Sequence, residues 1–232
     1  MKGAAAGAGA AALGAGTLFL PKSVVRASGG EGAEDSAVQI LSIAATAEQL
    51  AVTFYSHGIA NASVLGISGS NLAYLKAAVI EEQIHRDFEV ANGGKPITGT
   101  FSFPFAGETF QNLNKFVATL EQLEDAFIAA YLAAVKEFAL MGVPTLAVIA
   151  AEIGNIESEH RALGRDIGNL VPADNHAFAP ALIESVGDAV DVLASEGYLS
   201  PKSGNSYIYQ AVSTAGGGVT YRQPFIAGED ND

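Results

Sequence analysis

The sequence predicts an all-α protein built on a four-helix bundle. Apolar residues recur at steps of three and four in four long stretches, the spacing of an amphipathic helix. A sixteen-residue connection rich in glycine, proline and phenylalanine, residues 93–108, separates the second stretch from the third. Charged and aromatic residues of the first two stretches recur in the last two. We therefore divide the chain into a leader (1–30), the bundle (31–172), and a C-terminal short helix with an extended tail (173–232).

Composition limits the possible partners and cofactors. Of the 232 residues, 49% are hydrophobic, which is enough for one well-buried domain. The formal net charge of −13 argues against nucleic acid or an anionic membrane surface as a partner. Because there is no cysteine, disulfides, iron–sulfur clusters and thiolate ligands are excluded. Any bound metal must therefore be held by oxygen and imidazole.

The leader has the features of an export signal. Met1-Lys2 precedes an apolar run rich in alanine and glycine, and small residues around Val25–Ser28 fit a cleavage site. The run is too rich in glycine for a stable membrane span, and its low hydrophobicity resembles a twin-arginine signal. No Arg-Arg pair is present, so we expect that pair upstream of the first methionine. The prediction is export to the periplasm or the cell exterior; the alternative is a disordered alanine–glycine leader.

The first two helices each carry acidic residues on an apolar face. The first begins near Glu34, and its inward face holds Glu48 among apolar neighbours. A turn-rich segment follows, and the second helix is predicted over Asn71–Asn92, with Glu82 and His85 on the inner side. Gly93-Gly94 then ends it in the position of a helix C-cap.

The long connection suggests the topology. Extended, residues 93–108 would cover ~50 Å, whereas a 22-residue helix is ~35 Å long. We therefore predict that the connection crosses the bundle lengthwise. Helices one and two then form one antiparallel hairpin, and helices three and four form another.

The third and fourth helices repeat the arrangement. Thr109 is the predicted N-cap of the third helix, which continues to about Met141. After a Gly142–Pro144 turn, the fourth helix ends near Leu170–Pro172. A short amphipathic helix is predicted over Ser185–Glu196. The tail from residue 197 is expected to be extended and to wrap its own bundle or a neighbouring subunit, the latter giving a homo-oligomer.

An internal repeat connects the polar residues on the inner faces. Glu48 and Tyr55 recur as Glu124 and Tyr131, and Glu82 and His85 recur as Glu157 and His160. All four glutamates and both histidines lie on otherwise apolar helix faces. Burial of a carboxylate without a partner is expensive, so this pattern predicts a cation or strong donors at the centre of the bundle.

These motifs resemble a known group. The segments EQLAVTFY (Glu48–Tyr55), EEQIH (Glu81–His85), LEDAFIAAY (Leu123–Tyr131), ESEH (Glu157–His160) and the GGKP of the crossover are similar to the ferritin-like superfamily of carboxylate-bridged dimetal proteins. Within it, the chain looks most like the exported ferritin-like domain family that includes desiccation-related proteins. The resemblance implies a ferritin-like four-helix bundle whose long crossover joins helices two and three.

The resemblance also implies a ligand set. Its members are one carboxylate from each of two helices and a Glu-x-x-His pair from each of the others: Glu48, Glu124, Glu82, His85, Glu157 and His160. Four carboxylates and two divalent cations would together be neutral. Oxygen and imidazole ligands suit iron or manganese, and zinc is possible.

Several residues have competing interpretations. Tyr55 and Tyr131 are either ordinary core tyrosines or residues that bond a ligand carboxylate. Glu121 is the rival of Glu124, which is preferred because it keeps the seven-residue spacing to Tyr131. The ligand set itself is either a working site or a degenerate one kept for structure.

Other acidic residues and histidines lie off these faces. The interpretation for three glutamates is a solvated helix face: Glu81, Glu152 and Glu159. His57 and His176 lie in turn-rich segments with no glutamate at the matching offset. We expect them at the surface or in supporting positions.

The resemblance implies redox chemistry with dioxygen or peroxide in stress protection. No cysteine-bound rubredoxin module is present to deliver electrons, whereas catalase-like dismutation needs no external donor. The alternative function is a non-enzymatic, stress- or desiccation-associated structural protein whose metal site is vestigial or purely structural. Iron storage is a weaker third possibility because it requires a hollow shell of many subunits.

Overall fold

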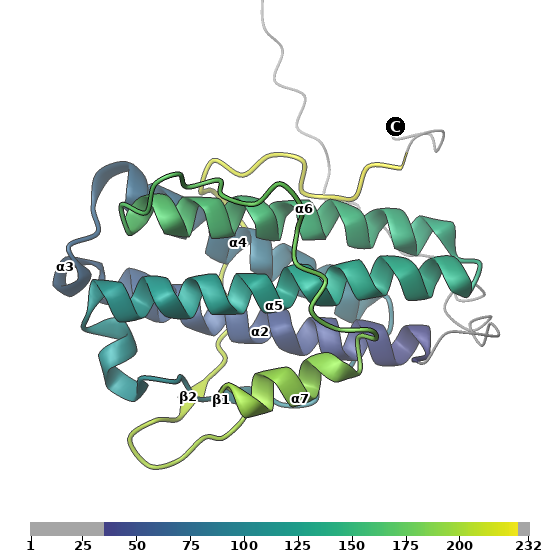
Figure 1. The fold of residues 1–232 in the computed structure, drawn as a ribbon, viewed down its shortest axis with the longest axis horizontal. Coiled ribbons are helices and arrows are strands. Elements are labelled where there is room, and N and C mark those ends of the chain that lie inside the picture. The colour runs from purple at the N-terminus through teal and green to yellow at the C-terminus, as the bar shows by residue number, and fades with distance from the viewer. Residues whose placement is uncertain (1–34, 227–232) are drawn as a thin grey trace, which may run out of the picture.

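The computed structural model describes residues 35–226 and shows an all-α bundle (Figure 1). Its four long helices are α2 (Ala37–Ala60), α4 (Gly69–Ala91), α5 (Leu113–Leu140) and α6 (Pro144–Ile167). The predicted fold class is confirmed. The predicted leader, residues 1–30, lies outside the described residues.

The helices form two antiparallel hairpins, as the loop lengths predict. At one end of the bundle α2 leads into α4 through the short helix α3 (Ala62–Leu65), and at the other end α5 turns into α6 (Figure 1). Gly142 lies in the latter turn with φ +71°, a left-handed conformation that glycine adopts without strain. A Cβ added to Gly164 of α6 would lie 2.1 Å from Leu120 Cδ2 of α5. Glycine at this position therefore permits the close approach of α5 and α6.

The connection between the hairpins runs along α2. Near its start, Lys95 N donates a hydrogen bond to Ser42 Oγ (2.9 Å). Near its end, the Phe110 ring lies 5.3 Å from the His57 ring, between centroids. Since Ser42 and His57 are ~22 Å apart along the helix axis, the connection crosses the bundle lengthwise, and this prediction is confirmed.

The C-terminal tail attaches to this crossover. Strand β1 (Thr100–Phe101) pairs antiparallel with β2 (Tyr207–Ile208) in a two-stranded sheet. Before β2, the Asn205 side chain accepts a hydrogen bond from Phe103 N (3.0 Å) and donates one to Phe103 O (2.9 Å). Of the two predicted courses for the tail, the structure shows the one along its own bundle.

Beyond β2 the tail runs from α4 to α6. Tyr209 Oη donates a hydrogen bond to Gln83 Oε1 of α4 (2.9 Å). Farther on, Phe225 N donates to Glu152 Oε1 of α6 (3.3 Å). The tail therefore spans the two helices that carry the Glu-x-x-His motifs.

Some predicted element ends are wrong. Helix α5 begins at Leu113, where Asn112 Oδ1 accepts a hydrogen bond from Lys115 N (3.1 Å). The predicted cap, Thr109, is instead buried in the 3₁₀ helix η1 (Ala106–Phe110). Asn is as good a cap as Thr, so composition alone did not separate them. Helix α6 ends at Ile167, and α7 (Asp188–Ser195) is shorter than predicted.

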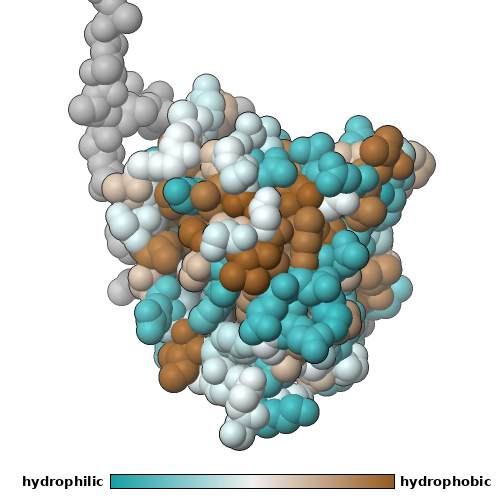
Figure 2. Space-filling model, turned by 90° about the vertical axis from the view of Figure 1, so that its left-hand side faces the viewer, coloured by the Kyte–Doolittle hydropathy of each residue, from teal (hydrophilic) through white to brown (hydrophobic). Residues whose placement is uncertain are grey.

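Helix α2 is the most apolar of the long helices and belongs to the core. Within residues 35–226 it is the helix whose length and hydropathy would also fit a membrane span, but 78% of that window is buried in the bundle. Figure 2 shows the end of the bundle at which α3 lies, where hydrophobic side chains lie among hydrophilic ones. Exposed apolar residues of the elements there include Val64 of α3 and Tyr74 of α4.

Candidate metal centre

The six predicted ligand residues converge at mid-bundle. Glu48 comes from α2, Glu124 from α5, and the two Glu-x-x-His pairs from α4 and α6. Their carboxylates are at most 2% exposed. Each lies on the inner face of its helix, where the apolar spacing places it.

The six residues form two overlapping groups, and each group brings its ligand atoms within 4.8 Å of one another. The first group comprises Glu48, Glu82, His85 and Glu157, and the second comprises Glu82, Glu124, Glu157 and His160. Glu82 and Glu157 belong to both. The arrangement therefore offers two adjacent cation positions with two shared carboxylates.

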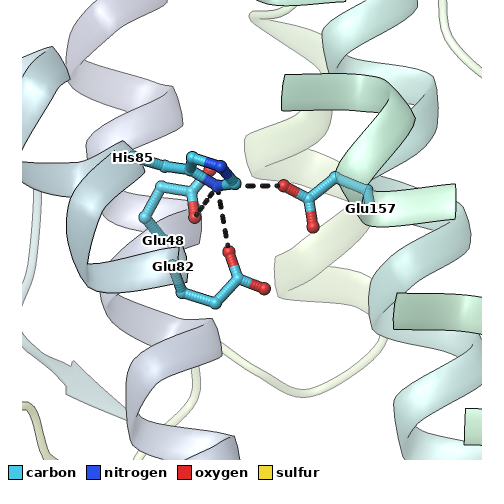
Figure 3. A group of neighbouring side chains, drawn as sticks. All are labelled: Glu48, Glu82, His85 and Glu157. Carbon is cyan, nitrogen blue, oxygen red and sulfur yellow. Dashed lines mark ion pairs between the residues drawn. The ribbon is translucent and has the colours of Figure 1, made fainter. Parts of the chain in front are cut away.

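The first group surrounds the imidazole of His85 (Figure 3). His85 Nδ1 lies 3.5 Å from Glu82 Oε2 and 3.5 Å from Glu157 Oε1. Glu48 Oε2 is 3.7 Å from the same nitrogen. The three carboxylates come from three different helices, so the fold itself brings these donor atoms together.

The second group is built around His160. Its Nδ1 lies 3.0 Å from Glu82 Oε1 and 3.3 Å from Glu157 Oε2. Its Nε2 lies 2.9 Å from Glu81 Oε2. Because an ionised carboxylate only accepts, this contact holds a proton on Nε2. Nδ1, which faces Glu82 and Glu157, would then be the ring atom that binds a cation in place of a proton.

Glu81 is therefore not a solvated residue, and that interpretation was wrong. Its side chain is 27% exposed and reaches from α4 to the His160 ring on α6. Helical spacing places Glu81 beside the inner face of its own helix. The spacing of one helix does not reveal a partner on another, which is why the contact was missed.

The two tyrosines bond the carboxylates crosswise. Tyr55 Oη of α2 donates a hydrogen bond to Glu124 Oε1 of α5, and Tyr131 Oη of α5 donates to Glu48 Oε1 of α2. Of the two interpretations given for these tyrosines, the structure shows the hydrogen bond to a carboxylate. Each bond fixes one carboxylate oxygen and leaves the other facing the centre.

Glu89 is a further buried carboxyl that the sequence analysis missed. It is 2% exposed, and its Oε1 lies 2.6 Å from Tyr131 Oη. Burial raises the pKa of Glu89 to about 8, against the lowering effect of Tyr131 and His85. Glu89 follows Glu82 by seven residues, which places both on one helix face. It escaped notice because the internal repeat has glycine, Gly164, at the related position.

Protons compensate the clustered charge when metal is absent. Burial raises the pKa of Glu48 and of Glu124 well above the usual range, and neighbouring carboxylates add to the effect. Burial opposes the charging of His85 and His160, but the surrounding carboxylates raise the pKa of both imidazoles overall. Burial also acts to raise the pKa of Glu82, yet its contacts with Glu48 and the histidines lower it. Two divalent cations would take the place of these protons.

The donor atoms fit a metal ion. Within residues 35–226, six atoms of the predicted ligand residues are buried without a hydrogen-bond partner: Glu48 Oε2, Glu82 Oε1, Glu82 Oε2, His85 Nδ1, Glu124 Oε2 and Glu157 Oε1. A buried polar atom without a partner costs about 1–3 kcal/mol. Because these atoms belong to two compact groups of oxygen and nitrogen donors, cations of the iron or manganese type would satisfy them together.

The rival acidic residues lie elsewhere. Glu121 forms an ion pair with Arg165, so Glu124 is the α5 carboxylate at the centre, as predicted. Glu159 is exposed, as expected for a solvated face. Glu152 is half-buried and accepts a hydrogen bond from the tail, so its assignment to that face was wrong.

The two remaining histidines stand outside the centre. His57 is half-buried against the rings of Phe110 and Tyr207. Burial lowers its pKa. His176 Nε2 lies 3.0 Å from the Arg161 guanidinium.

A protein-family model described as "Ferritin-like domain" matches residues 36–169. The match extends from the start of α2 to just beyond α6 and includes all six residues of the two groups. No curated protein and no solved structure matches the chain.

Proposed function

The chain belongs to the ferritin-like domain family, and on this premise we propose that it binds two divalent metal ions and reacts with a small oxidant, dioxygen or peroxide. The observation that carries the proposal is the pair of overlapping donor groups that share Glu82 and Glu157. Both residues are fully buried. A solvated acidic face would not bury them, and a single-metal site would not need to share them.

Each residue has a proposed part in holding the metals. Glu48 and His85 belong to one position, Glu124 and His160 belong to the other, and both positions share the remaining two glutamates. Iron and manganese suit this set, and zinc would also bind. When bound, the two redox-active ions would supply the electron transfer to oxygen species.

The residues around the ligands keep the donor atoms in place. Tyr55 and Tyr131 hold Glu124 and Glu48, and Glu81 holds the His160 ring. Hydrophobic clusters on both sides of the centre limit the access of water. Removal of a residue that orients a metal ligand in this way typically lowers metal affinity or activity by about 10–100-fold.

We further propose that the protein is exported and acts in stress protection. The support is the apolar alanine–glycine run with a single positive charge, Lys2, in front of it and small residues around Val25–Ser28 after it. The similarity of the motifs to desiccation-related proteins points to the same role. Mass spectrometry of the N-terminus of the protein recovered from its native cells tests export, and an intact leader in the cytosolic fraction would contradict it.

A second function, structural and non-enzymatic, has one observation in its favour. Hydrophobic clusters pack on both sides of the centre, one around Leu50 and Phe116 and the other around Ile40 and Phe138. These clusters would stabilise the bundle without metal. In this alternative the protein supports partners or surfaces during stress, and its metal site is vestigial or purely structural.

Reactivity distinguishes the two functions. The protein is loaded with ferrous iron without oxygen and is then mixed with dioxygen or with peroxide, while ferric absorbance is recorded. A manganese-loaded sample is tested for oxygen release from peroxide. The redox proposal expects oxidation or oxygen release well above that of the free metal, and its loss in Glu157→Gln. Rates equal to those of free metal in both samples would favour the structural alternative.

A further inference from the structure

An apolar cavity lies beside the metal centre. Its volume is about 30 Å³, and helices α2, α4, α5, α6 and α7 all contribute to its wall. The lining includes Ala44, Ala130, Leu146 and Val186. Among the described residues that line it, Glu89 and Tyr131 alone have a polar side chain.

These two polar residues separate the cavity from the centre. Tyr131 Oη bonds both Glu89 Oε1 (2.6 Å) and Glu48 Oε1. Glu48 belongs to the first donor group, with His85. A molecule in the cavity is therefore one side chain away from the Glu48–His85 position.

The cavity differs from the space on the other side of the centre. A smaller cavity of about 10 Å³ adjoins Tyr55 and His160. His160 belongs to the second donor group. It is lined by Gly164, the counterpart of Glu89 in the internal repeat. A water molecule needs roughly 10–15 Å³ of such space, so the smaller cavity holds at most one water-sized molecule. The larger cavity has room for a diatomic molecule.

The lining selects the chemistry of an occupant. A buried water typically makes about three hydrogen bonds, and apolar cavities remain dry. Hydrogen peroxide has two hydroxyl groups and faces the same requirement. Glu89 Oε1 and Tyr131 Oη already bond each other, and Glu89 Oε2 is buried without a partner. The rest of the wall is apolar, so this single free oxygen falls short of the about three partners that a buried water typically has. An uncharged molecule that needs no hydrogen bond, such as dioxygen, enters without that cost.

We propose that this cavity is a binding site for dioxygen, from which the gas reaches the Glu48–His85 side of the metal centre. The inference rests on the proposed function and narrows its oxidant to dioxygen. In the reaction, two ferrous ions give up one electron each, and dioxygen takes both electrons with two protons to become hydrogen peroxide.

Xenon tests the binding site without any reaction. Xenon occupies dry apolar cavities, so pressurised crystals of the metal-free protein should show it next to Tyr131. Ala130→Leu on α5 fills the cavity and should abolish this occupancy. The matched control, Ala118→Leu, enlarges an exposed alanine on the same helix and should leave occupancy unchanged. Absence of xenon in the wild type, or equal occupancy in Ala130→Leu, would overturn the proposal.

Oxidation rates test the use of the site. In ferrous-loaded protein, Ala130→Leu should slow oxidation by dioxygen at least several-fold and leave the initial rate with peroxide unchanged. Metal content should equal that of the wild type and of Ala118→Leu. Equal slowing with both oxidants, or no slowing with dioxygen, would contradict the proposal. If Ala130→Leu does not fold, Ala44→Leu fills the cavity from α2 and is judged by the same criteria.

The two tests separate this inference from the proposed function. A chain that retains no metal would contradict the proposed function, and xenon would still show whether the cavity binds an apolar gas. If Ala130→Leu retains metal and reacts with dioxygen as fast as the wild type does, only the dioxygen site is contradicted, and the proposed function stands.

Discussion

Glu82 and Glu157 are fully buried and are shared by both donor groups. Each of them therefore lies close to the ionisable side chains of both groups. Uncompensated charges in such a place destabilise the fold strongly, so their side chains require protons or cations nearby. Substitution of either one should therefore affect both proposed metal positions together.

Glu157→Gln tests this sharing. The amide keeps the shape of the side chain but removes the charge and one donor oxygen from both positions. We expect metal content after gel filtration to fall from about two ions per chain to less than one. Glu159→Gln, an exposed neighbour on the same helix, should retain the wild-type content. Full occupancy in Glu157→Gln would contradict the shared role.

Glu81→Gln tests the support of His160. An amide can present its NH₂ group to Nε2 and thereby favour the wrong ring tautomer. We expect the weaker of the two metal-binding steps to lose about tenfold or more in affinity, measured by competition with a chelator. Asp87→Asn, exposed on the same helix, serves as the control. Unchanged affinity in Glu81→Gln would mean that the contact is incidental.

The pH dependence of the metal-free protein tests Glu89. The pKa of its carboxyl rises from the usual 4.5 to about 8, mainly through burial. Between these values the folded state holds a proton that the unfolded chain releases. The contribution of Glu89 to stability is therefore complete below pH 4.5 and declines as pH rises to 8, by up to ~1.4 kcal/mol per pH unit.

Glu89→Gln should remove this decline. Charged or titrating groups near Glu89 include Tyr131, His85, Glu157 and Glu82, which are present in both proteins. Urea unfolding at pH 5 and pH 8 should therefore show the variant gaining stability relative to the wild type at the higher pH. An equal difference in stability between the variant and the wild type at both pH values would contradict a neutral Glu89 carboxyl.

Glu81 and Glu89 also show what one sequence can reveal about a site. The six central residues were predictable because each interrupts an apolar helix face and the pattern occurs twice. Glu81 was missed because its partner, His160, lies on another helix. Glu89 was missed because the repeat does not include it. Pairing between helices depends on tertiary packing, which the spacing within one helix does not encode.

At the scale of elements, the crossover and the tail support each other. Their two-residue strands are too short for a recognisable alternation of apolar and polar residues. The contact between Asn205 and Phe103 joins positions 102 residues apart. The length of the crossover was enough to predict its course along the bundle, because an extended segment of that length can span a helix of the bundle from end to end. Its partner in the tail was not predictable.

Asn205→Ala tests this attachment. Asn205 makes two hydrogen bonds to the buried backbone of Phe103. Since the variant leaves both backbone groups without these partners, we expect a loss of about 1–3 kcal/mol in the free energy of unfolding. Ser203→Ala, exposed two residues earlier, should change stability by less than about 0.5 kcal/mol. Equal unfolding midpoints for Asn205→Ala and the wild type would show that the tail does not stabilise the bundle.

At the scale of the whole molecule, two similar helical hairpins enclose one centre. Each hairpin contributes a Glu-x-x-His pair, a single glutamate and a tyrosine, and the tyrosine bonds cross from one hairpin to the other. The hairpins therefore meet through polar groups as well as through apolar packing. Fold and centre were predictable together because the same apolar faces that form the bundle also carry the polar residues.

The symmetry of the two halves is incomplete around the centre. Glu89 and the larger cavity adjoin one position, whereas Gly164 and the smaller cavity adjoin the other. The histidine of the second position has a carboxylate partner in Glu81, and the related residue in the other half is Ile156. We therefore expect the two positions to differ in affinity and in access to oxidant.

The two donor groups predict that the folded chain holds two metal ions between its hairpins. Native mass spectrometry of the protein, loaded with ferrous iron or with manganese and then separated from free metal, counts the ions on each folded chain. We expect two ions per chain in the wild type and their removal by chelator. A wild-type chain that carries no ion after loading with either metal would contradict it.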